Sequence, residues 1–223
     1  MIFNHFDRIV FAGDSVTDMG SKNPVGEGLF DNVGKSYVRI LENMLATYYP
    51  ETYLRVTNSG ISGNTSRDLL ARWQRDVLDL NPDHVSICIG INDVWRQFDS
   101  PAMTNVAVSP EEDEANMREM LGSLQGKVKT IFLLTPYYME PNREDWMRAR
   151  MDDYSNICRR LAPEYGAILV DIQAAFDEYF KYRHSSYIAW DRIHPNQIGA
   201  TIIAREFLKH CDFDYAHTPA RER

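Results

Sequence analysis

The sequence has few cysteines, and those it has are spread widely along the chain. Only three occur among 223 residues, at positions 88, 158 and 211. An odd number at such wide spacing argues against a disulfide framework or a cysteine metal site. Cys88 lies within an apolar run and Cys158 on an apolar helical stripe, so we expect buried thiols.

Positive charge is also scarce. The chain has 24 Lys and Arg residues against 32 Asp and Glu, a net charge of −8. Such a surface repels polyanions, so we expect neither nucleic acid nor a membrane as a partner. No apolar run approaches the roughly 18 residues of a membrane span. The first residues carry no basic segment typical of a signal peptide, and the sequence therefore predicts a cytoplasmic protein.

The remaining composition is that of an ordinary globular protein, with no Gly/Ser-rich linker, internal repeat or low-complexity tract. Hydrophobic residues make up 44% and charged residues 25% of the chain. The length suits one domain with a buried core. We expect this single domain to span residues 1–211 and a loosely ordered polar C-terminal tail to occupy residues 212–223.

Short apolar runs alternate with segments of helical periodicity. Five runs rich in β-branched residues predict strands at Arg8–Ala12, Tyr53–Thr57, Val85–Ile89, Thr130–Leu134 and Ala167–Asp171. Around them, apolar residues recur every three or four positions, as amphipathic helices require. This alternation predicts an α/β fold, with a five-stranded and mostly parallel sheet between two layers of helices.

Four polar segments follow predicted strands or precede the last predicted helix. GDSVTDMG places Ser15 after the first strand, NSGISGNT places Gly63 after the second, and GINDVW places Asn92 after the third. DRIHP places Asp191 and His194 just before the last helix. In open α/β sheets, ligands bind beyond the carboxyl ends of the strands. The sequence therefore predicts that these five residues meet at one edge of the sheet.

These residue types supply every role that acyl transfer needs. A serine nucleophile requires a base to take its proton, a carboxylate to orient that base, and donors for the oxyanion. Ser15 fits the role of the nucleophile, His194 that of the base, and Asp191 that of the carboxylate. The Ser15 N–H, the Gly63 N–H and the Asn92 amide fit the oxyanion hole. We therefore predict a serine hydrolase that requires neither a metal nor a cofactor.

Each segment alone also has a structural interpretation. Asp14 can form an Asx turn, and Ser15 can cap a helix. A set made of Asp14, Asp18, Asp93, Asp191 and His194 resembles a metal cluster, but it lacks tight ligand spacing. The order of the four segments, each at its expected strand end, favours the catalytic interpretation.

The four segments resemble the four sequence blocks of the SGNH (GDSL) hydrolases. The resemblance implies a flavodoxin-like fold with Ser15 as nucleophile, Gly63 and Asn92 as oxyanion donors, and His194 with Asp191 as the base. GDSVTDMG departs from the family spelling only at Val16, an apolar replacement. Longer stretches, such as NSGISGNTSRDLLARW, SICIGINDVWRQFD, QAAFDE and AWDRIHP, are similar to intracellular acetylxylan esterases of this superfamily.

The substrate is predicted from the neighbours of these residues and from the resemblance. Trp95 and Trp190 lie beside the predicted site and, with Asp14, are our candidates for substrate binding; aromatic faces suit sugars as well as plain packing. The chain shows no long apolar lid segment. We predict deacetylation of acetylated xylo-oligosaccharides or related small carbohydrate esters. A short-chain lipolytic esterase, a thioesterase or a lysophospholipase is the alternative.

Two further expectations concern function class and assembly. A non-catalytic sugar- or nucleotide-binding module would share the same layout, but no strand is followed by G-x-G-x-x-G or a P-loop. The segment Phe98–Glu112 is long and lacks periodicity before Pro110, and loops of this kind usually have a functional or interface role. We therefore expect a homo-oligomer, with a monomer carrying a surface loop as the alternative.

Overall fold

The sheet of the computed structural model, which describes residues 1–103 and 105–219, has six strands in the order β2-β3-β1-β4-β5-β6. Their bounds are β1 Arg8–Gly13, β2 Gly26–Glu27, β3 Arg55–Gly60, β4 His84–Cys88, β5 Thr130–Leu134 and β6 Ile168–Val170. β2 pairs antiparallel with β3, whereas the other pairs are parallel. Without the edge strand β2, this order is that of flavodoxin-like doubly wound sheets.

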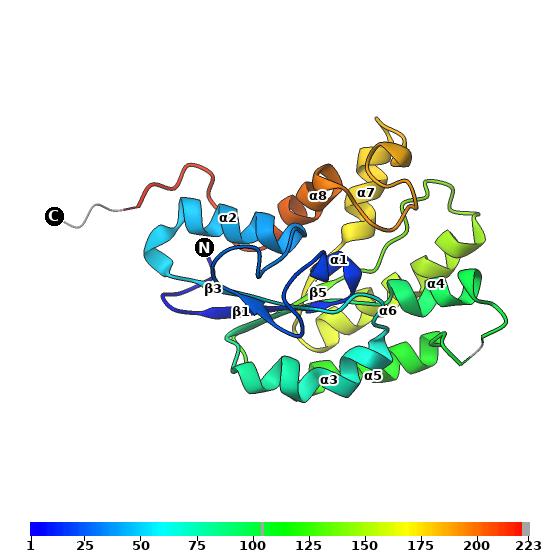
Figure 1. Ribbon diagram of the computed structural model, residues 1–223, viewed down its shortest axis with the longest axis horizontal. Helices are drawn as coiled ribbons and strands as arrows, with labels where there is room; N and C mark the ends of the chain where they lie inside the picture. Colours follow the sequence, from blue (N-terminus) through cyan, green and yellow to red (C-terminus); the bar gives the residue numbers. More distant parts are fainter. Residues whose placement is uncertain (104, 220–223) are drawn as a thin grey trace.

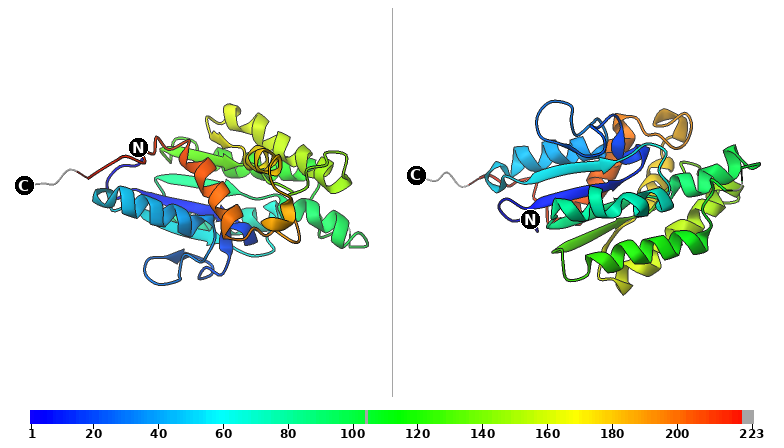
Figure 2. Two further views of the ribbon diagram at one scale, coloured as in Figure 1. Left: turned by 90° about the horizontal axis from the view of Figure 1, so that it is seen from above. Right: turned by 60° about the horizontal axis from the view of Figure 1, so that its bottom comes forward.

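Helices cover both faces of the sheet, as Figures 1 and 2 show. α2, α7 and α8 lie on one face, and α3, α5 and α6 on the other, while the short α1 and α4 begin at the strand ends. Their bounds are α1 Ser15–Asp18, α2 Tyr37–Tyr48, α3 Ser66–Asp76, α4 Ile91–Asp99, α5 Pro110–Leu124, α6 Trp146–Glu164, α7 Ile172–Phe180 and α8 Gln197–Leu208. The predicted three-layer α/β fold is therefore confirmed.

The predicted number of strands was one too low. The additional strand, β2, contains two residues, which is too short to produce a sequence pattern. It is held at the edge because the Glu27 carboxylate accepts hydrogen bonds from Arg55 Nε and Thr57 Oγ1 of β3 at 2.7 and 2.8 Å. The second predicted strand also began too early, because Tyr53 has a left-handed backbone conformation and β3 starts at Arg55.

Side chains of alternate strand residues form two separate cores. In β1, Ile9 and Phe11 belong to the cluster under α2, α7 and α8, whereas Val10 and Ala12 belong to the cluster under α3, α5 and α6. This is the alternation that a strand buried on both faces requires. The two cores fix the helices against the sheet and hence fix the loops at its edge.

The register of the central strands aligns their carboxyl ends. Gly13, the last residue of β1, pairs with Gly60 of β3 on one side and with Cys88 of β4 on the other. The polar segments that follow these three residues therefore leave the sheet at the same level. β1 is also the strand from which the chain winds in opposite directions, the place where ligands bind in such sheets.

The N-terminal segment lies against the segment that follows α8, where the Ile2 N–H donates to the Cys211 carbonyl at 3.1 Å. Over residues 212–219, the predicted tail makes contacts with the segment around the end of α2. Phe213 packs edge-on against Tyr48 of α2, and His217 stacks on Tyr49 at 4.0 Å between ring centroids. The segment thus makes aromatic contacts although most of its residues are polar. Residues 220–223 of the predicted tail lie outside the described residues.

Two other features bear on the sequence-based expectations. Within residues 1–103 and 105–219, no helix has the length and apolar character to cross a membrane. The predicted loop Phe98–Glu112 is shorter than expected, because α4 continues to Asp99 and α5 begins at Pro110. Residue 104 of this loop lies outside the described residues.

Candidate active site

Ser15 begins α1, directly after the turn at the end of β1. Asp14 caps this helix: its carboxylate accepts a hydrogen bond from the Val16 N–H at 2.9 Å. Asp14 is 1% exposed, and burial raises the pKa of its carboxyl to about 7. The prediction that Asp14 binds substrate is therefore corrected: the residue lies beneath Ser15, the predicted nucleophile, and shapes its turn.

Ser15, His194 and Asp191 form a hydrogen-bonded triad. Ser15 Oγ lies 2.9 Å from His194 Nε2, and His194 Nδ1 lies 2.6 Å from Asp191 Oδ2. The other Asp191 oxygen accepts the backbone N–H groups of Ile193 and His194 at 3.0 and 2.9 Å. Burial raises the Asp191 pKa, but the hydrogen bonds from His194 and Ile193 outweigh it and hold the pKa below its usual value.

The loop that carries the triad histidine is fastened to the segment after β5. Tyr137 Oη donates to the Ile193 carbonyl at 3.0 Å, and the Met139 N–H donates to the Arg192 carbonyl at 2.9 Å. Arg192 has a φ of 63° there, a conformation that few residues adopt without support. These bonds place His194 over Ser15 before α8 begins.

Gly63 lies in an exposed turn between β3 and α3, with a φ of 84° that favours glycine. We call residues 61–64 the β3–α3 loop. Its start is held by the Ile61 N–H, which donates to the Gly13 carbonyl at 3.1 Å. Its middle is held by Asp18 of α1, whose carboxylate accepts the Ser62 N–H at 3.1 Å and Ser62 Oγ at 2.6 Å. The loop is therefore tied to the turn that carries Ser15, the predicted nucleophile, which we call the nucleophile turn.

Asn92 lies in the first turn of α4 and contacts the same loop. Its Nδ2 donates to the Asn64 carbonyl at 2.9 Å, and its Oδ1 accepts from Arg96 at 3.3 Å. Because one of the two Nδ2 hydrogens is used at Asn64, one remains for a ligand. The next residue, Asp93, accepts the Ser66 N–H and Ser66 Oγ, which ties the start of α4 to the start of α3.

The structure thus brings together the predicted nucleophile, base and carboxylate, and links the loops of the three predicted oxyanion donors. Sequence analysis missed two residues that arrange these loops, Asn64 and Arg72. Asn64 lies within the segment NSGISGNT, which could have drawn attention to it. Arg72 lies in the longer stretch NSGISGNTSRDLLARW, but nothing in the helical pattern distinguishes it from an ordinary surface arginine.

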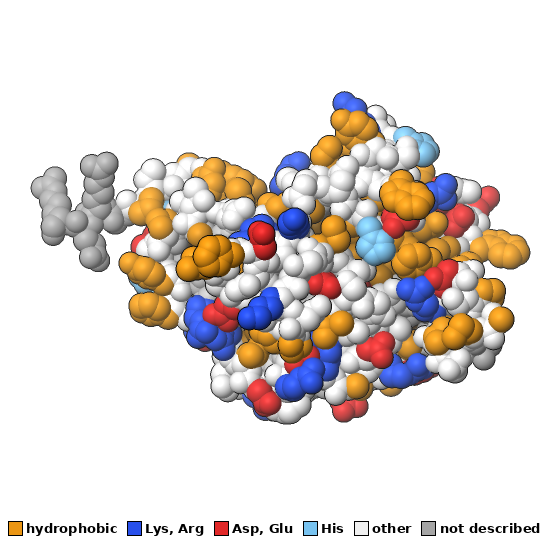
Figure 3. Space-filling view, viewed as in Figure 1, with side chains coloured by type: hydrophobic (Ala, Val, Ile, Leu, Met, Phe, Trp, Pro, Cys, Tyr) orange, Lys and Arg blue, Asp and Glu red, His pale blue; other side chains and the backbone are white. Residues whose placement is uncertain are grey.

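The two tryptophans near the triad differ in their surroundings. The half-buried Trp95 ring meets the His194 ring edge-on, with 5.8 Å between centroids, and Arg96 lies over the Trp95 ring. Trp190, which precedes Asp191, is 90% exposed. In Figure 3, hydrophobic side chains gather over α4 and the neighbouring loops on the right of the view. Trp95 therefore packs against His194, the predicted base, while Trp190 is free to contact another molecule.

The acidic residues near the site have separate structural partners. Asp14 binds the Val16 N–H, Asp18 binds Ser62, and Asp93 binds Ser66. Over residues 1–103 and 105–219, no group of three or more His, Cys, Asp or Glu side chains could hold a metal ion. The three carboxylates therefore serve as anchors for neighbouring backbone.

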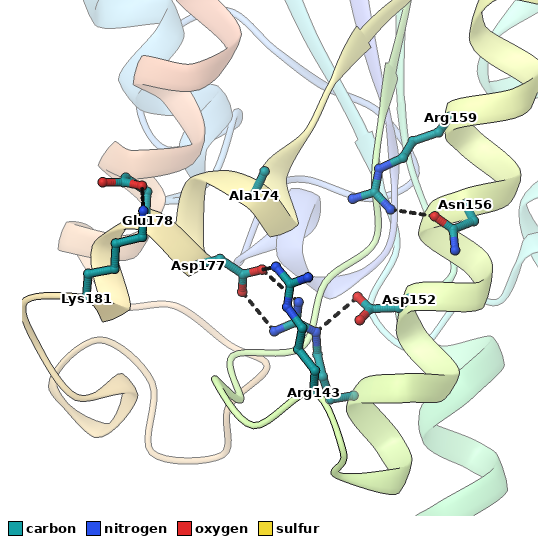
Figure 4. A pocket seen from close by; sticks show the side chains of 9 residues that line it. Arg143, Asp152, Asn156, Arg159, Ala174, Asp177, Glu178 and Lys181 are labelled. Atoms are coloured by element: carbon teal, nitrogen blue, oxygen red, sulfur yellow. Dashed lines mark hydrogen bonds and ion pairs between the residues drawn. The ribbon is translucent and has the colours of Figure 1, made fainter.

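A concave region away from the triad lies between α6 and α7 and is drawn in Figure 4. This pocket of about 450 Å³ is lined by charged side chains that pair with one another. Arg148 Nη2 lies 2.7 Å from Asp177, and Arg148 Nε lies 3.0 Å from Asp152. None of the residues that line this pocket belongs to the triad. The positive and negative charges of the lining residues largely balance one another.

Comparison with known proteins agrees with this geometry. The model of the GDSL-like lipase/acylhydrolase family matches residues 11–202, which include all the residues of the triad. The chain belongs to this family. As a GDSL-like acylhydrolase, it is a carboxylic ester hydrolase.

Individual proteins also resemble the chain over nearly its whole length. An acetylxylan esterase of Geobacillus stearothermophilus is 45% identical over 212 residues, which are 95% of this chain and 97% of the relative. The crystal structure of the G. stearothermophilus acetylxylan esterase Axe2 matches with a TM-score of 0.96 and 44% identity, covering 98% of this chain and 100% of that one. LAE5, an alpha/beta hydrolase enzyme from the metagenome of Lake Arreo in Spain, is 51% identical with a TM-score of 0.91, covering 94% and 96%.

Proposed function

We propose that this protein is a serine esterase that removes acetyl groups from acetylated xylo-oligosaccharides or related carbohydrates. The observation that carries the proposal is the hydrogen-bonded series Ser15 Oγ, His194 and Asp191, at 2.9 and 2.6 Å. The 45% identity to an acetylxylan esterase supports the choice of an acetyl ester on a sugar.

In the proposed mechanism, Ser15 Oγ attacks the acetyl carbonyl carbon while His194 Nε2 accepts the serine proton. Asp191 holds the imidazole through Nδ1 and stabilises the imidazolium that forms. The tetrahedral intermediate collapses as the bond to the sugar oxygen breaks, and His194 protonates the leaving hydroxyl. Water then attacks the acetyl-serine with His194 again as base, which releases acetate and restores Ser15.

The proposed oxyanion hole uses the Ser15 N–H, the Gly63 N–H and the Asn92 Nδ2. Ser15 is the first residue of α1, where N–H groups have no partner within the helix. The exposed Gly63 turn and the remaining Nδ2 hydrogen of Asn92 support the other two assignments. Donors held rigidly in this way stabilise the charge that develops on the carbonyl oxygen.

For substrate binding we propose Trp190 and Trp95. The exposed indole of Trp190 suits the apolar face of a sugar ring, and it lies next to Asp191. Trp95, which packs on the His194 ring, limits the space for the acyl group beside the base. This arrangement favours a small acyl group on a sugar over a long acyl chain.

We also propose a cytoplasmic homo-oligomer. The three cysteines are buried free thiols, which suits a compartment that keeps thiols reduced. Leu29 and Phe30 are 79% and 88% exposed, and exposed apolar side chains of this kind are enriched at interfaces between subunits.

The function is tested by measuring acetate release from acetylated xylo-oligosaccharides by the wild-type protein and by Ser15→Ala. We expect turnover by the wild type and none by the variant. Ser186→Ala, which removes an exposed hydroxyl from the loop leading to Asp191, is the matched control and should retain full activity. Turnover of octanoyl or thioester substrates in place of acetyl sugars would reassign the protein to the lipolytic or thioesterase alternative.

A further inference from the structure

Arg72 lies on α3, seven residues after the segment NSGISGNT, and its guanidinium is buried at the carboxyl ends of β1 and β3. Only 8% of the side chain is exposed. A buried guanidinium is costly unless its N–H groups are all bonded. The hydrogen-bond partners of the Arg72 guanidinium therefore indicate its structural role.

All five N–H groups of the Arg72 guanidinium have acceptors. Nη2 donates to the Gly13 carbonyl at 3.0 Å and to the Ser59 carbonyl at 2.9 Å. Nη1 donates to Ser59 Oγ at 3.1 Å and to Asp76 at 3.3 Å. Nε donates to Asn64 Oδ1 at 2.7 Å. One planar group thus joins the strand before the nucleophile, the strand before Gly63 and the β3–α3 loop.

The contacts continue from Arg72 to the third predicted oxyanion donor. Asn64 accepts Arg72 Nε at its side chain and Asn92 Nδ2 at its backbone carbonyl. Gly13, which accepts Arg72 Nη2, also accepts the Ile61 N–H at 3.1 Å. Arg72 therefore couples the turn of Ser15 to the turn of Gly63. Through Asn64, it is also coupled to the Asn92 side chain.

The charge of Arg72 alone does not account for this arrangement. Asp76, its one carboxylate partner, also binds Arg75 through two hydrogen bonds at 2.5 and 2.9 Å. Four of the five Arg72 bonds instead go to neutral oxygens of the strand ends and the loop. A planar fork can satisfy these directions together, whereas a lysine ammonium cannot.

We propose that Arg72 is a positioning residue that, through Asn64, sets the geometry of the oxyanion hole. This inference rests on the proposed esterase function. The guanidinium holds the β3–α3 loop at the height of the nucleophile turn, and Asn64 fixes the Asn92 amide against that loop. Arg72 touches no reacting atom and acts only through these neighbours.

The experiment compares three variants by steady-state hydrolysis of an acetyl ester. Arg72→Lys keeps the positive charge beside Asp76 but loses the fork, and Asn64→Ala removes only the link from Arg72 Nε to the loop. Arg75→Lys is the matched control, because it makes the same change on the same helix beside the same carboxylate. Thermal unfolding of each variant shows how much of it is folded at the assay temperature.

We expect Asn64→Ala to lower kcat about tenfold and Arg72→Lys about 10- to 100-fold, with KM within about twofold, as for groups that act in the transition state. Arg75→Lys should retain wild-type kcat. In an Asn92→Ala background, Asn64→Ala should reduce kcat by less than about twofold, because the two residues act on the same donor.

A second readout separates this inference from the choice of substrate. The rate at which a fluorophosphonate labels Ser15 depends on the same oxyanion donors and on no particular sugar ester. Slower labelling of folded Asn64→Ala and Arg72→Lys, with normal labelling of Arg75→Lys, supports the inference even if acetylated xylo-oligosaccharides are not hydrolysed. Unchanged labelling and kcat in both variants, or losses that match the unfolded fraction, would overturn it.

Discussion

Ser15 Oγ and His194 Nε2 lie 2.9 Å apart although 179 positions separate the two residues in the chain. The separation is bridged by the sheet: Ser15 follows β1, while the His194 loop is fastened by Tyr137 and Met139 to the segment after β5. The contact therefore depends on the register of β1, β4 and β5 and on the loop that they support.

Asp191→Asn tests the orientation of the base. The asparagine can present its amide N–H to His194 Nδ1, which forces the proton to Nε2 and leaves no acceptor for the Ser15 proton. We expect kcat to fall by about 10³- to 10⁴-fold, as triads of this type show when the wrong tautomer is held. Steady-state kinetics measures the effect, and a fall of less than tenfold would contradict the assigned role.

Asn92→Ala tests the oxyanion hole. The variant loses the donor to the carbonyl oxygen and the bond to the Asn64 carbonyl. We expect kcat to fall about 10²- to 10³-fold with little change in KM, because the donor acts mainly when charge develops. An increase in KM at constant kcat would instead assign Asn92 to ground-state binding.

The acyl chain-length profile tests the substrate. With Trp95 packed against the His194 ring and no apolar lid segment in the sequence, we expect acetyl esters to react much faster than octanoyl or longer esters. Hydrolysis of a series of chromogenic esters that share one leaving group measures the profile. A maximum at long chains would support the lipase or lysophospholipase alternative.

Asp14→Asn tests the buried carboxyl beneath the nucleophile. Burial raises the Asp14 pKa in the folded state from 3.8 to about 7, so the folded protein binds this proton more tightly than the unfolded chain does. The resulting stability is fully present below about pH 4 and is lost as the pH rises through 7. Asparagine carries no such charge and can still accept the Val16 N–H.

The free energy of unfolding of Asp14→Asn, relative to the wild type, should therefore rise between pH 4 and pH 7. The slope is at most about 1.4 kcal/mol per pH unit, the limit for one proton. Denaturant unfolding at several pH values measures it, and the difference should be constant above pH 8. Parallel stability curves for the two proteins over the whole range would show that Asp14 does not titrate in this way.

Size exclusion with light scattering tests the proposed assembly. We expect a mass that is a multiple of 25.8 kDa at micromolar concentration, because the exposed Leu29 and Phe30 side chains would be covered in an interface. Replacing Phe30 by Ser should weaken the assembly. A mass near that of one chain for the wild type would end the proposal.

The sequence by itself determined the class of fold and the triad candidates. Apolar runs of strand length alternating with helical stripes led to a parallel sheet between helices, because each pattern suits one way of burying apolar surface. The strand-end rule then placed Ser15, Gly63 and Asn92 at one edge. β2 was missed because two residues carry no periodicity.

Only the tertiary structure decided which side chains support the candidate site. Asp14 was predicted to meet substrate, but packing turned it beneath α1, where it caps the helix. Arg72 was given no role from the sequence, yet it joins Gly13, Ser59 and Asn64. A side chain's neighbours depend on strand register and helix packing across long separations in the chain. Local sequence records the propensity of each segment, whereas the direction of a side chain at a strand end is set by what packs against it.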